Sequence, residues 1–205
     1  MTFQFYKPAK CLLPYVAGYL ESDHTKSTIG GQHTLFPNGL SGVFFNFGNG
    51  QLILKKNYTV PDISVYGQID RHFTIVHTPG FYSLSVLLKP TLLSKLLRVD
   101  MAEFTNAASD GTLLRADFRI LYEQLLYTTN IQQKIQLLDT YFTLAIKNCD
   151  DKKTVSDYAL QFIHQAEPMP IEALAHKLGV SQRYLEVDFK RTVGISPKMY
   201  SLIIR

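Results

Sequence analysis

The segment from Ile171 to Tyr200 constrains the fold of this 205-residue chain more than any other. Its first apolar residues recur at the i, i+3, i+4 and i+7 spacing of one helical face. They are Ile171, Leu174, Ala175 and Leu178. Gly179 follows where a left-handed residue closes a helix without steric penalty, and Ser181 is a good N-cap for a second helix. The pattern predicts two short helices joined by a tight turn, which is a helix-turn-helix.

The second helix of this segment divides into an inward and an outward face. Tyr184, Leu185 and Phe189 are expected to face the core, and Val180 is expected to fill the angle between the helices. The remaining positions are mostly polar or basic and are expected to face outward. They are Gln182, Arg183, Glu186, Lys190 and Arg191. A second helix with such a face is the element that enters the major groove of DNA.

The same segment resembles the first helix-turn-helix of the AraC/XylS transcriptional regulators. The residues that match the family pattern are Ile171, Leu174, Ala175, Gly179, Ser181, Tyr184, Leu185, Phe189, Lys190, Gly194, Ser196, Pro197 and Tyr200. Two features differ from the family. Val187 stands where the recognition helix usually has an arginine, and the sequence stops at Arg205, before a second helix-turn-helix. We therefore expect a truncated, sequence-specific regulator whose own DNA binding is weak or absent.

The resemblance also implies which residues contact DNA. Arg183, Glu186 and Val187 fall where the family reads bases. Arginine can form two hydrogen bonds to guanine, whereas Val187 can contact only a thymine methyl group. Sequence-independent phosphate contacts, or solvated charge, are expected at the other polar positions. These are Gln182, Lys190, Arg191 and Lys198. Glu186 and Asp188 are expected to oppose the approach of phosphate.

Residues 2–90 have the composition of β-structure. Several runs are rich in Val, Ile, Phe and Tyr and are separated by Gly, Pro and Asn turns. These runs are 43–47, 51–54, 63–66, 72–76 and 82–88. The apolar run at 11–20 is expected to form a short amphipathic helix or a turn. Many short strands at this spacing predict an antiparallel sandwich or a small barrel.

Residues 1–110 also resemble the cupin-like N-terminal domain of one subgroup of these regulators. The matching segments are 37–39, 43–47, 67–68 and 86–90. The resemblance implies a domain that senses a small molecule or holds regulatory contacts. Its aromatic side chains either fill the core or line a pocket. The pocket candidates are Phe44, Phe45, Phe47, Tyr66, Phe73 and Tyr82, with polar candidates Gln68, Asp70, Arg71 and His72.

From residue 91 onward the apolar spacing becomes helical. A short helix is predicted at 92–97 and two long helices at 112–128 and 131–148, with Asn130 as the N-cap of the last. Their apolar stripes are Leu114, Phe118, Leu121 and Leu125, and Ile131, Ile135, Leu138, Phe142 and Ala145. The resemblance implies that this hairpin forms a homodimer interface. The alternative is that both stripes pack within one chain, because the same spacing suits either use.

A polar break at 148–153 predicts a linker, after which Thr154 can cap a helix with Asp157 in its first turn. The segment 167–170, with prolines at 168 and 170, is expected to end that helix. The sequence therefore divides into a cupin-like sensor domain at 1–110, a dimerisation hairpin at 111–150 and a partial helix-turn-helix domain at 151–205. We predict an α+β fold, with an antiparallel β-barrel or sandwich first, a helical hairpin next and an all-α domain last.

Composition and motifs exclude several other functions. A net charge of +4 permits nucleic-acid binding without arguing for it. The histidines of the β region contain no His-x-His pair, and His72 and His77 would point to opposite faces of one strand. His24 and His33 add no metal-ligand spacing. With no nucleophile motif or glycine-rich phosphate loop, we predict no metal, no cofactor and no enzymatic activity.

The remaining features concern location and the second functional reading. Cys11 and Cys149 lie far apart in the sequence and are expected to be reduced thiols in a cytoplasmic protein. No run approaches the ~20 apolar residues of a membrane helix. The expected partners are DNA, a small-molecule effector and a second copy of the chain. The alternative function is a sensor or oligomerisation module that does not bind DNA and keeps the helix-turn-helix as a structural cap.

Overall fold

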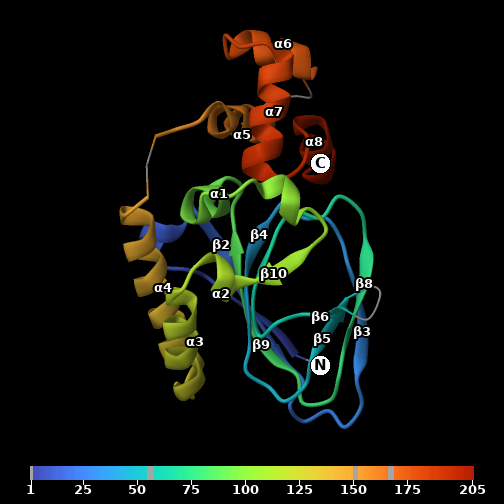
Figure 1. Ribbon diagram of the computed structural model, residues 1–205, viewed down its shortest axis with the longest axis vertical. Helices are drawn as coiled ribbons and strands as arrows, with labels where there is room; N and C mark the ends of the chain where they lie inside the picture. Colours follow the sequence, from blue (N-terminus) through green and yellow to red (C-terminus); the bar gives the residue numbers. More distant parts are fainter. Residues whose placement is uncertain (1, 55–57, 150–151, 166–168) are drawn as a thin grey trace.

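The computed structural model describes residues 2–54, 58–149, 152–165 and 169–205. Two antiparallel sheets form an N-terminal sandwich, a helical hairpin covers one side of it, and a second group of helices sits at one end (Figure 1). This confirms the predicted fold class of an antiparallel β-region followed by helices. The predicted linker and the predicted helix end at 167–170 fall partly outside the described residues.

The larger sheet, as far as the chain is described, has six strands in the order β1-β2-β9-β4-β7-β10. Their bounds are β1 (Thr2–Tyr6), β2 (Val16–Asp23), β4 (Ser41–Asn46), β7 (Ile63–Tyr66), β9 (Tyr82–Leu88) and β10 (Ala108–Asp110). The smaller sheet has the order β3-β8-β5-β6. Its strands are β3 (Gly31–Leu35), β5 (Leu52–Leu54), β6 (Tyr58–Thr59) and β8 (Phe73–His77).

Each predicted strand is present as one of β4, β5, β7, β8 and β9, but the helix or turn predicted for the run at 11–20 extends only to Tyr15. Only Lys10–Leu12 forms a short 3₁₀ helix, and β2 begins at Val16. β2 pairs with β1 on one side and β9 on the other. Its apolar residues are therefore those of an interior strand, which is buried by neighbours that are distant in the sequence.

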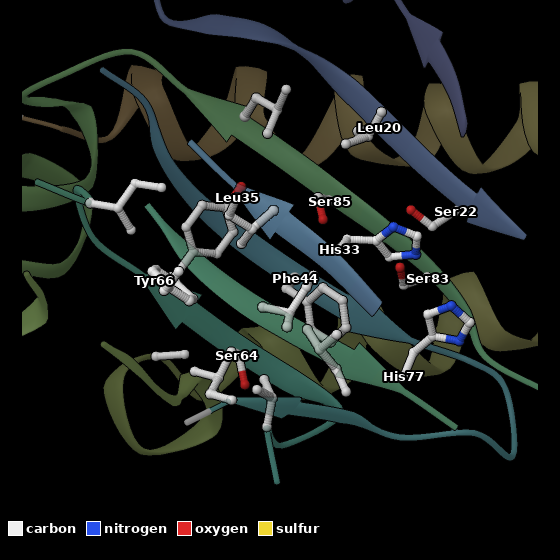
Figure 2. Close-up of a pocket in the computed structure, with 18 of the residues that line it drawn as sticks. Leu20, Ser22, His33, Leu35, Phe44, Ser64, Tyr66, His77, Ser83 and Ser85 are labelled. Carbon is white, nitrogen blue, oxygen red and sulfur yellow. The ribbon is translucent and has the colours of Figure 1, made fainter. Parts of the chain in front are cut away.

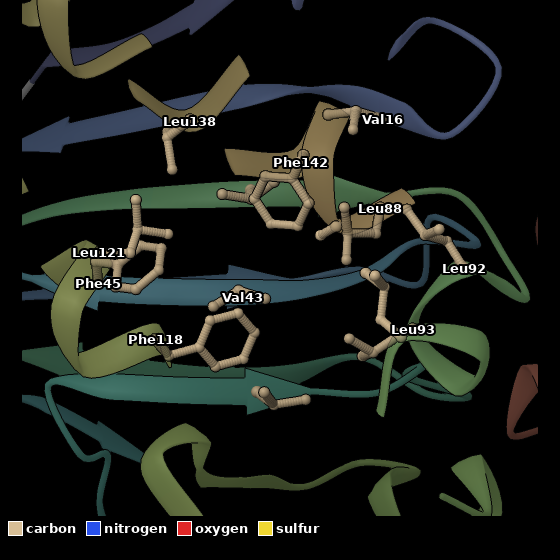
Figure 3. Packing of buried hydrophobic residues seen from close by; sticks show 14 of the residues in the cluster. Val16, Val43, Phe45, Leu88, Leu92, Leu93, Phe118, Leu121, Leu138 and Phe142 are labelled. Carbon is tan, nitrogen blue, oxygen red and sulfur yellow. The ribbon is translucent and has the colours of Figure 1, made fainter. Parts of the chain in front are cut away.

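The helical hairpin covers the outer face of the larger sheet. It consists of α3 (Asp117–Tyr127) and α4 (Ile131–Lys147), and the first predicted helix is broken because Arg115 is extended after the short α2 (Gly111–Leu114). Asn130 caps α4 as predicted, accepting hydrogen bonds from two backbone amides. The hairpin stripes face the sheet, where Phe118 packs edge-on against Phe45 (Figure 3).

The residues predicted at the dimer interface are consequently used inside one chain. Six of them are buried and two are half-buried against the same core. These residues are Leu114, Phe118, Leu121, Leu125, Ile131, Ile135, Leu138 and Phe142. The sheet already removes their apolar surface from water. These residues therefore follow the alternative prediction, in which both stripes pack within one chain. A homodimer interface formed by the hairpin would have to use its outward side, where Ile120 and Tyr127 are exposed.

A buried lysine ties the two helices of the hairpin together. Lys134 is 3% exposed, and its ammonium group donates a 2.7 Å hydrogen bond to the carbonyl of Leu125 near the C-terminus of α3. The same nitrogen lies 4.0 Å from the centre of the Phe47 ring. The negative end of a helix and an aromatic face both favour a cation. Lys134 therefore caps the C-terminus of α3, a role that the sequence analysis did not predict.

The C-terminal helices form a separate core. They are α5 (Val155–Gln165), α6 (Ile171–Lys177), α7 (Gln182–Val193) and α8 (Pro197–Ile203). Gly179 has a φ of 69° and donates to the carbonyl of His176, while Val180 donates to that of Ala175. These two bonds are the Schellman arrangement that ends a helix with a left-handed glycine, which confirms the predicted turn. Among the described residues, no helix is both long enough and apolar enough to cross a membrane.

Polar contacts dock this helical group on the sandwich. The Thr154 hydroxyl accepts a hydrogen bond from the Asp157 amide at the start of α5, which confirms the predicted cap, and the Asp157 carboxylate accepts from Thr154 in return. Asp157 also accepts from Thr91 at 2.6 Å and from Lys95 at 2.8 Å, both belonging to the sandwich side. Thr91 precedes α1 (Leu92–Leu97) and has a φ of 71°, which is strained for a β-branched residue. One carboxylate therefore joins a helix cap to a contact between two parts of the chain.

We expect Asp157→Asn to lower the free energy of unfolding by about 1–3 kcal/mol at pH 7. Burial alone would raise the pKa of Asp157, but hydrogen bonds from Lys95, Thr91 and Thr154 outweigh it and hold that pKa below its usual range. A depressed folded-state pKa stabilises the protein above the unfolded value of about 3.9, and this stabilisation is lost as pH falls through the folded value. The difference between wild type and variant should therefore shrink below about pH 4.

Urea denaturation followed by circular dichroism at pH 7 and in acid measures both effects. Glu123→Gln removes a carboxylate from an exposed position on α3 and is the control, with no expected change. Equal stability of wild type and Asp157→Asn at pH 7 would contradict the docking role.

Candidate DNA-binding face and ligand pocket

The second helix of the helix-turn-helix is capped as its sequence predicts. The Ser181 hydroxyl accepts a hydrogen bond from the Tyr184 amide at the start of α7. At the other end Gly194 has a φ of 105° and its amide donates to the Lys190 carbonyl. Leu185 and Phe189 are fully buried against α5 and α6. The helix is thus held on one side and presents the other side to solvent.

The residues predicted to contact DNA are all exposed. They are Gln182, Arg183, Glu186, Val187, Lys190, Arg191 and Lys198. Gln182 donates a 2.7 Å hydrogen bond to Glu186, which orders two of these side chains along the face. Within the described chain, Arg183 and Lys190 form no ion pair. Their charges are therefore not neutralised by the protein.

Two residues of α7 differ from the sequence-based assignment. Tyr184 was predicted to face the core, but 54% of it is exposed, close to the 61% of Val187. Helical geometry places residues three apart on one side of a helix, so these two side chains add an apolar area to the exposed face. Such an area suits thymine methyl groups or sugars rather than the polar edge of guanine.

The sequence suggested that Asp188 opposes the approach of phosphate, but the structure contradicts this. Asp188 is only 6% exposed, so its carboxylate does not face DNA. Its carboxylate accepts a 2.7 Å hydrogen bond from the Ser156 hydroxyl at the start of α5. It also pairs with Arg191 at 3.0 Å. A carboxylate at a helix N-terminus is favoured by the helix dipole, so Asp188 holds α7 to α5 and partly neutralises Arg191.

A cavity of about 220 Å³ lies between the two sheets of the sandwich. Figure 2 shows its floor, formed by the larger sheet, with Phe44, Tyr66, Ser64, Ser83 and Ser85 around it. Its remaining walls are mostly Leu, Ile and Phe side chains, among them Leu35 and Phe73. A cavity of ~150 Å³ admits benzene, so this one has room for a compact ring system with a small substituent.

The cavity is lined by only some of the residues predicted for the pocket. Tyr66 lines the cavity, as do the other candidates Phe44 and Phe73. Phe45, Phe47 and Tyr82 do not, because alternate residues of a strand point to opposite faces and these meet the hairpin side or its edge.

The polar candidates also lie outside the cavity wall. Gln68 is buried, but its amide donates to the carbonyl of Gly39 beside the pocket, at 3.0 Å. His72 is exposed, and Asp70 and Arg71 pair with each other at 2.9 Å on the surface. The predicted polar end of the pocket is therefore not at this strand start.

Sequence reasoning missed the polar end that does exist. His24, His33 and His77 line the cavity and have ring nitrogens within 4.8 Å of one another. They were set aside because no two share the close spacing of a metal motif. They come from three different strands or strand ends, so only pairing between strands reveals their proximity.

An intact helix-turn-helix with an exposed and partly basic second helix defines the class as a DNA-binding transcription regulator, and the family comparisons agree. Residues 164–200 match the family described as bacterial regulatory helix-turn-helix proteins, AraC family. Residues 4–110 match the domain of unknown function DUF6597, which is more than half of the chain. The chain therefore belongs to the DUF6597 family and carries an AraC-type helix-turn-helix.

Other comparisons are weaker. No curated protein sequence matches the chain. A solved structure of a lysine-to-alanine variant of apo ToxT from Vibrio cholerae is 11% identical, with a TM-score of 0.35, and the match covers 91% of this chain and 98% of ToxT. Unsaturated fatty acid-bound ToxT from Vibrio cholerae is 12% identical, with a TM-score of 0.25, covering 89% and 97%. Scores this low say nothing about the ligands of the present chain.

Proposed function

We propose that this chain is a sequence-specific transcription regulator whose sandwich pocket takes a small effector. The observation that carries the proposal is one turn, at 36–40, that borders both parts. Phe36, Asn38 and Leu40 line the pocket. Between them Gly39 is buried against α8, where an added methyl group would lie 3.1 Å from Ile204 and 3.2 Å from Tyr200.

The contacts around this turn support a relay of pocket occupancy to the helix-turn-helix. Gln68 holds the Gly39 carbonyl, and the Tyr200 hydroxyl lies 3.0 Å from a ring nitrogen of His164 on α5. Thr105, just after the 3₁₀ helix Met101–Phe104, donates a 2.6 Å hydrogen bond to the carbonyl of Gly194 at the end of α7. An effector that fits better when the turn is displaced would shift how α7 and α8 sit, by as much as its affinities for the two arrangements differ.

The DNA-contact residues also remain part of the proposal. Arg183 has the chemistry to read guanine, Val187 and Tyr184 to contact a thymine methyl group or a sugar, and Lys190 to bind phosphate. One helix-turn-helix covers one half-site, so we expect specific binding by the 205-residue chain to be weaker than nanomolar. A homodimer, which would join two half-sites, stays a prediction.

We expect Arg183→Ala to weaken binding to a preferred duplex about 5- to 150-fold, because a bidentate arginine–guanine contact contributes about 1–3 kcal/mol. The duplex would be enriched from a random-sequence library with the full chain, and fluorescence anisotropy would measure affinity at several salt concentrations. Lys190→Ala should instead weaken preferred and random duplexes alike and reduce the salt slope by about 1.

Arg119→Ala is the matched control, because Arg119 is an exposed arginine on α3, in the hairpin. It should leave binding unchanged. If the library yields no enriched duplex, or if Arg183→Ala and Arg119→Ala bind equally well, the chain is better described as the alternative: a sensor or oligomerisation module that keeps the helix-turn-helix as a structural cap.

The effector pocket is tested by filling it. We expect 1-naphthol, a fluorescent two-ring phenol, to bind wild type and to change its affinity for DNA, with a coupling of about 1–3 kcal/mol. Ser85→Phe adds a ring into the cavity from the sheet and should abolish both effects. Thr34→Phe adds the same ring to β3 at an exposed position between two pocket-lining residues and should abolish neither.

Circular dichroism would check that both variants fold, because overpacking a core costs about 1–3 kcal/mol. Equal naphthol binding by wild type and Ser85→Phe would show that the cavity is not the binding site. If 1-naphthol binds without any change in DNA affinity, the cavity is a binding site but its occupancy does not affect the helix-turn-helix.

A further inference from the structure

Three histidines converge at one end of the sandwich cavity. His24 directly follows β2 of the larger sheet, whereas His33 and His77 belong to β3 and β8 of the smaller sheet. Each offers a ring nitrogen, and these atoms all lie within 4.8 Å of one another. Figure 2 shows the His33 and His77 rings directed to the same end of the pocket, beside Ser22 and Ser83.

Strand register explains why these rings meet. β3 and β8 pair so that Gly31 is opposite His77 and His33 is opposite Ile75. His33 and His77 are therefore diagonal neighbours on one face of the sheet, close enough for long side chains to interact. A side chain at position 31 would collide with Nε2 of His77, so glycine there keeps the space in front of that nitrogen open.

The Nε2 atoms of the three histidines can each offer a free lone pair to a ligand. Nδ1 of His77 lies 3.3 Å from the backbone carbonyl of Thr78, and the N–H on Nδ1 can donate to that oxygen, which leaves the Nε2 lone pair free. Within the described chain, Nε2 of His24 and Nε2 of His33 are buried and have no hydrogen-bond partner. His24 as a whole is 6% exposed, so water cannot readily satisfy its nitrogen.

The surroundings of His24 and His33 favour their neutral rings. Burial, followed by the neighbouring His77 and His33 rings, lowers the pKa of His24. Burial and His77 lower the pKa of His33 in the same direction. Two aromatic rings complete the shell, with Phe3 edge-on to His33 and Phe81 stacked on His77, each with 5.5 Å between ring centres. A neutral imidazole is the form that binds metal, and an apolar shell limits competition from water.

We propose that His24, His33 and His77 bind a divalent transition-metal ion, Zn²⁺ in the first place, at the end of the sandwich cavity. Three imidazoles with no thiolate or carboxylate in the cluster match the donor set that suits zinc, nickel or copper and not calcium or magnesium. Zinc held by three protein ligands keeps a fourth position open. The three histidines line the cavity, so a ligand in the cavity lies next to this site. The carbonyl of Thr78 behind His77 is the kind of outer partner that orients a metal-bound histidine.

The test uses the untagged full chain, stripped with a chelator and dialysed under reducing conditions. Zinc binding is measured by competition with a chromophoric chelator, and Co²⁺ is added separately to read the coordination from its visible absorption. We expect one Zn²⁺ per chain and the intense Co²⁺ spectrum of a four-coordinate site. His24→Gln, His33→Gln and His77→Gln should each weaken zinc binding by at least about 100-fold.

Matched controls separate this site from other metal-binding groups. His72→Gln removes an exposed histidine of the sandwich, and His176→Gln removes one from the surface of α6. Cys11→Ser removes an exposed thiol that could bind zinc elsewhere. All three should retain wild-type affinity. Circular dichroism checks that each variant folds, and because three variants address one site, a folding failure in one leaves the other two informative.

Two outcomes would contradict the metal site. If zinc binds wild type no more tightly than it binds the folded His33→Gln and His77→Gln variants, or if the loss follows Cys11→Ser instead, the histidines do not form a metal site. DNA binding and naphthol binding are not readouts of this experiment, so its outcome is independent of the proposed regulatory function.

Discussion

The fold depends on a sheet that is covered on both faces. In β4 the neighbours Phe44 and Phe45 point to opposite sides, because side chains alternate along a strand. Phe45 meets Phe118 of the hairpin in a filled core, while Phe44 faces the cavity beneath the smaller sheet. The hairpin cannot leave the sheet without exposing that core to water. One strand thus separates a packed side of the domain from a hollow side.

The position of the helix-turn-helix follows from a few polar contacts at the end of this sandwich. The Asp157 carboxylate accepts hydrogen bonds from Thr91 and Lys95, and the Thr105 hydroxyl donates one to the Gly194 carbonyl. Thr91 holds a left-handed backbone conformation, and such strain persists only where the surroundings enforce it. Hydrogen bonds of this kind depend on geometry, so they fix where the helical group sits on the sandwich.

Local signals were predictable from the sequence because each acts within a few residues. Ser181, Asn130 and Thr154 cap the helices that their types predict, and Gly179 takes the left-handed conformation that ends α6. Faces were harder to predict. An alternating strand shows that two faces exist but not which one meets a helix, and so Phe45, Phe47 and Tyr82 were assigned to the wrong side. Buried charges such as Lys134 were missed for the same reason.

The sequence by itself determined the helix-turn-helix and the strand-then-helix order, because caps, turn glycines and apolar spacing are properties of neighbouring residues. Only the tertiary structure decided that the apolar stripes of the hairpin are buried within one chain. It also decided that Asp188 joins α7 to α5, and that the turn at 36–40 borders both the cavity and α8. It also brought His24, His33 and His77 together. Strand register and sheet stacking join residues that are distant in the sequence, and no local pattern records which partners they will meet.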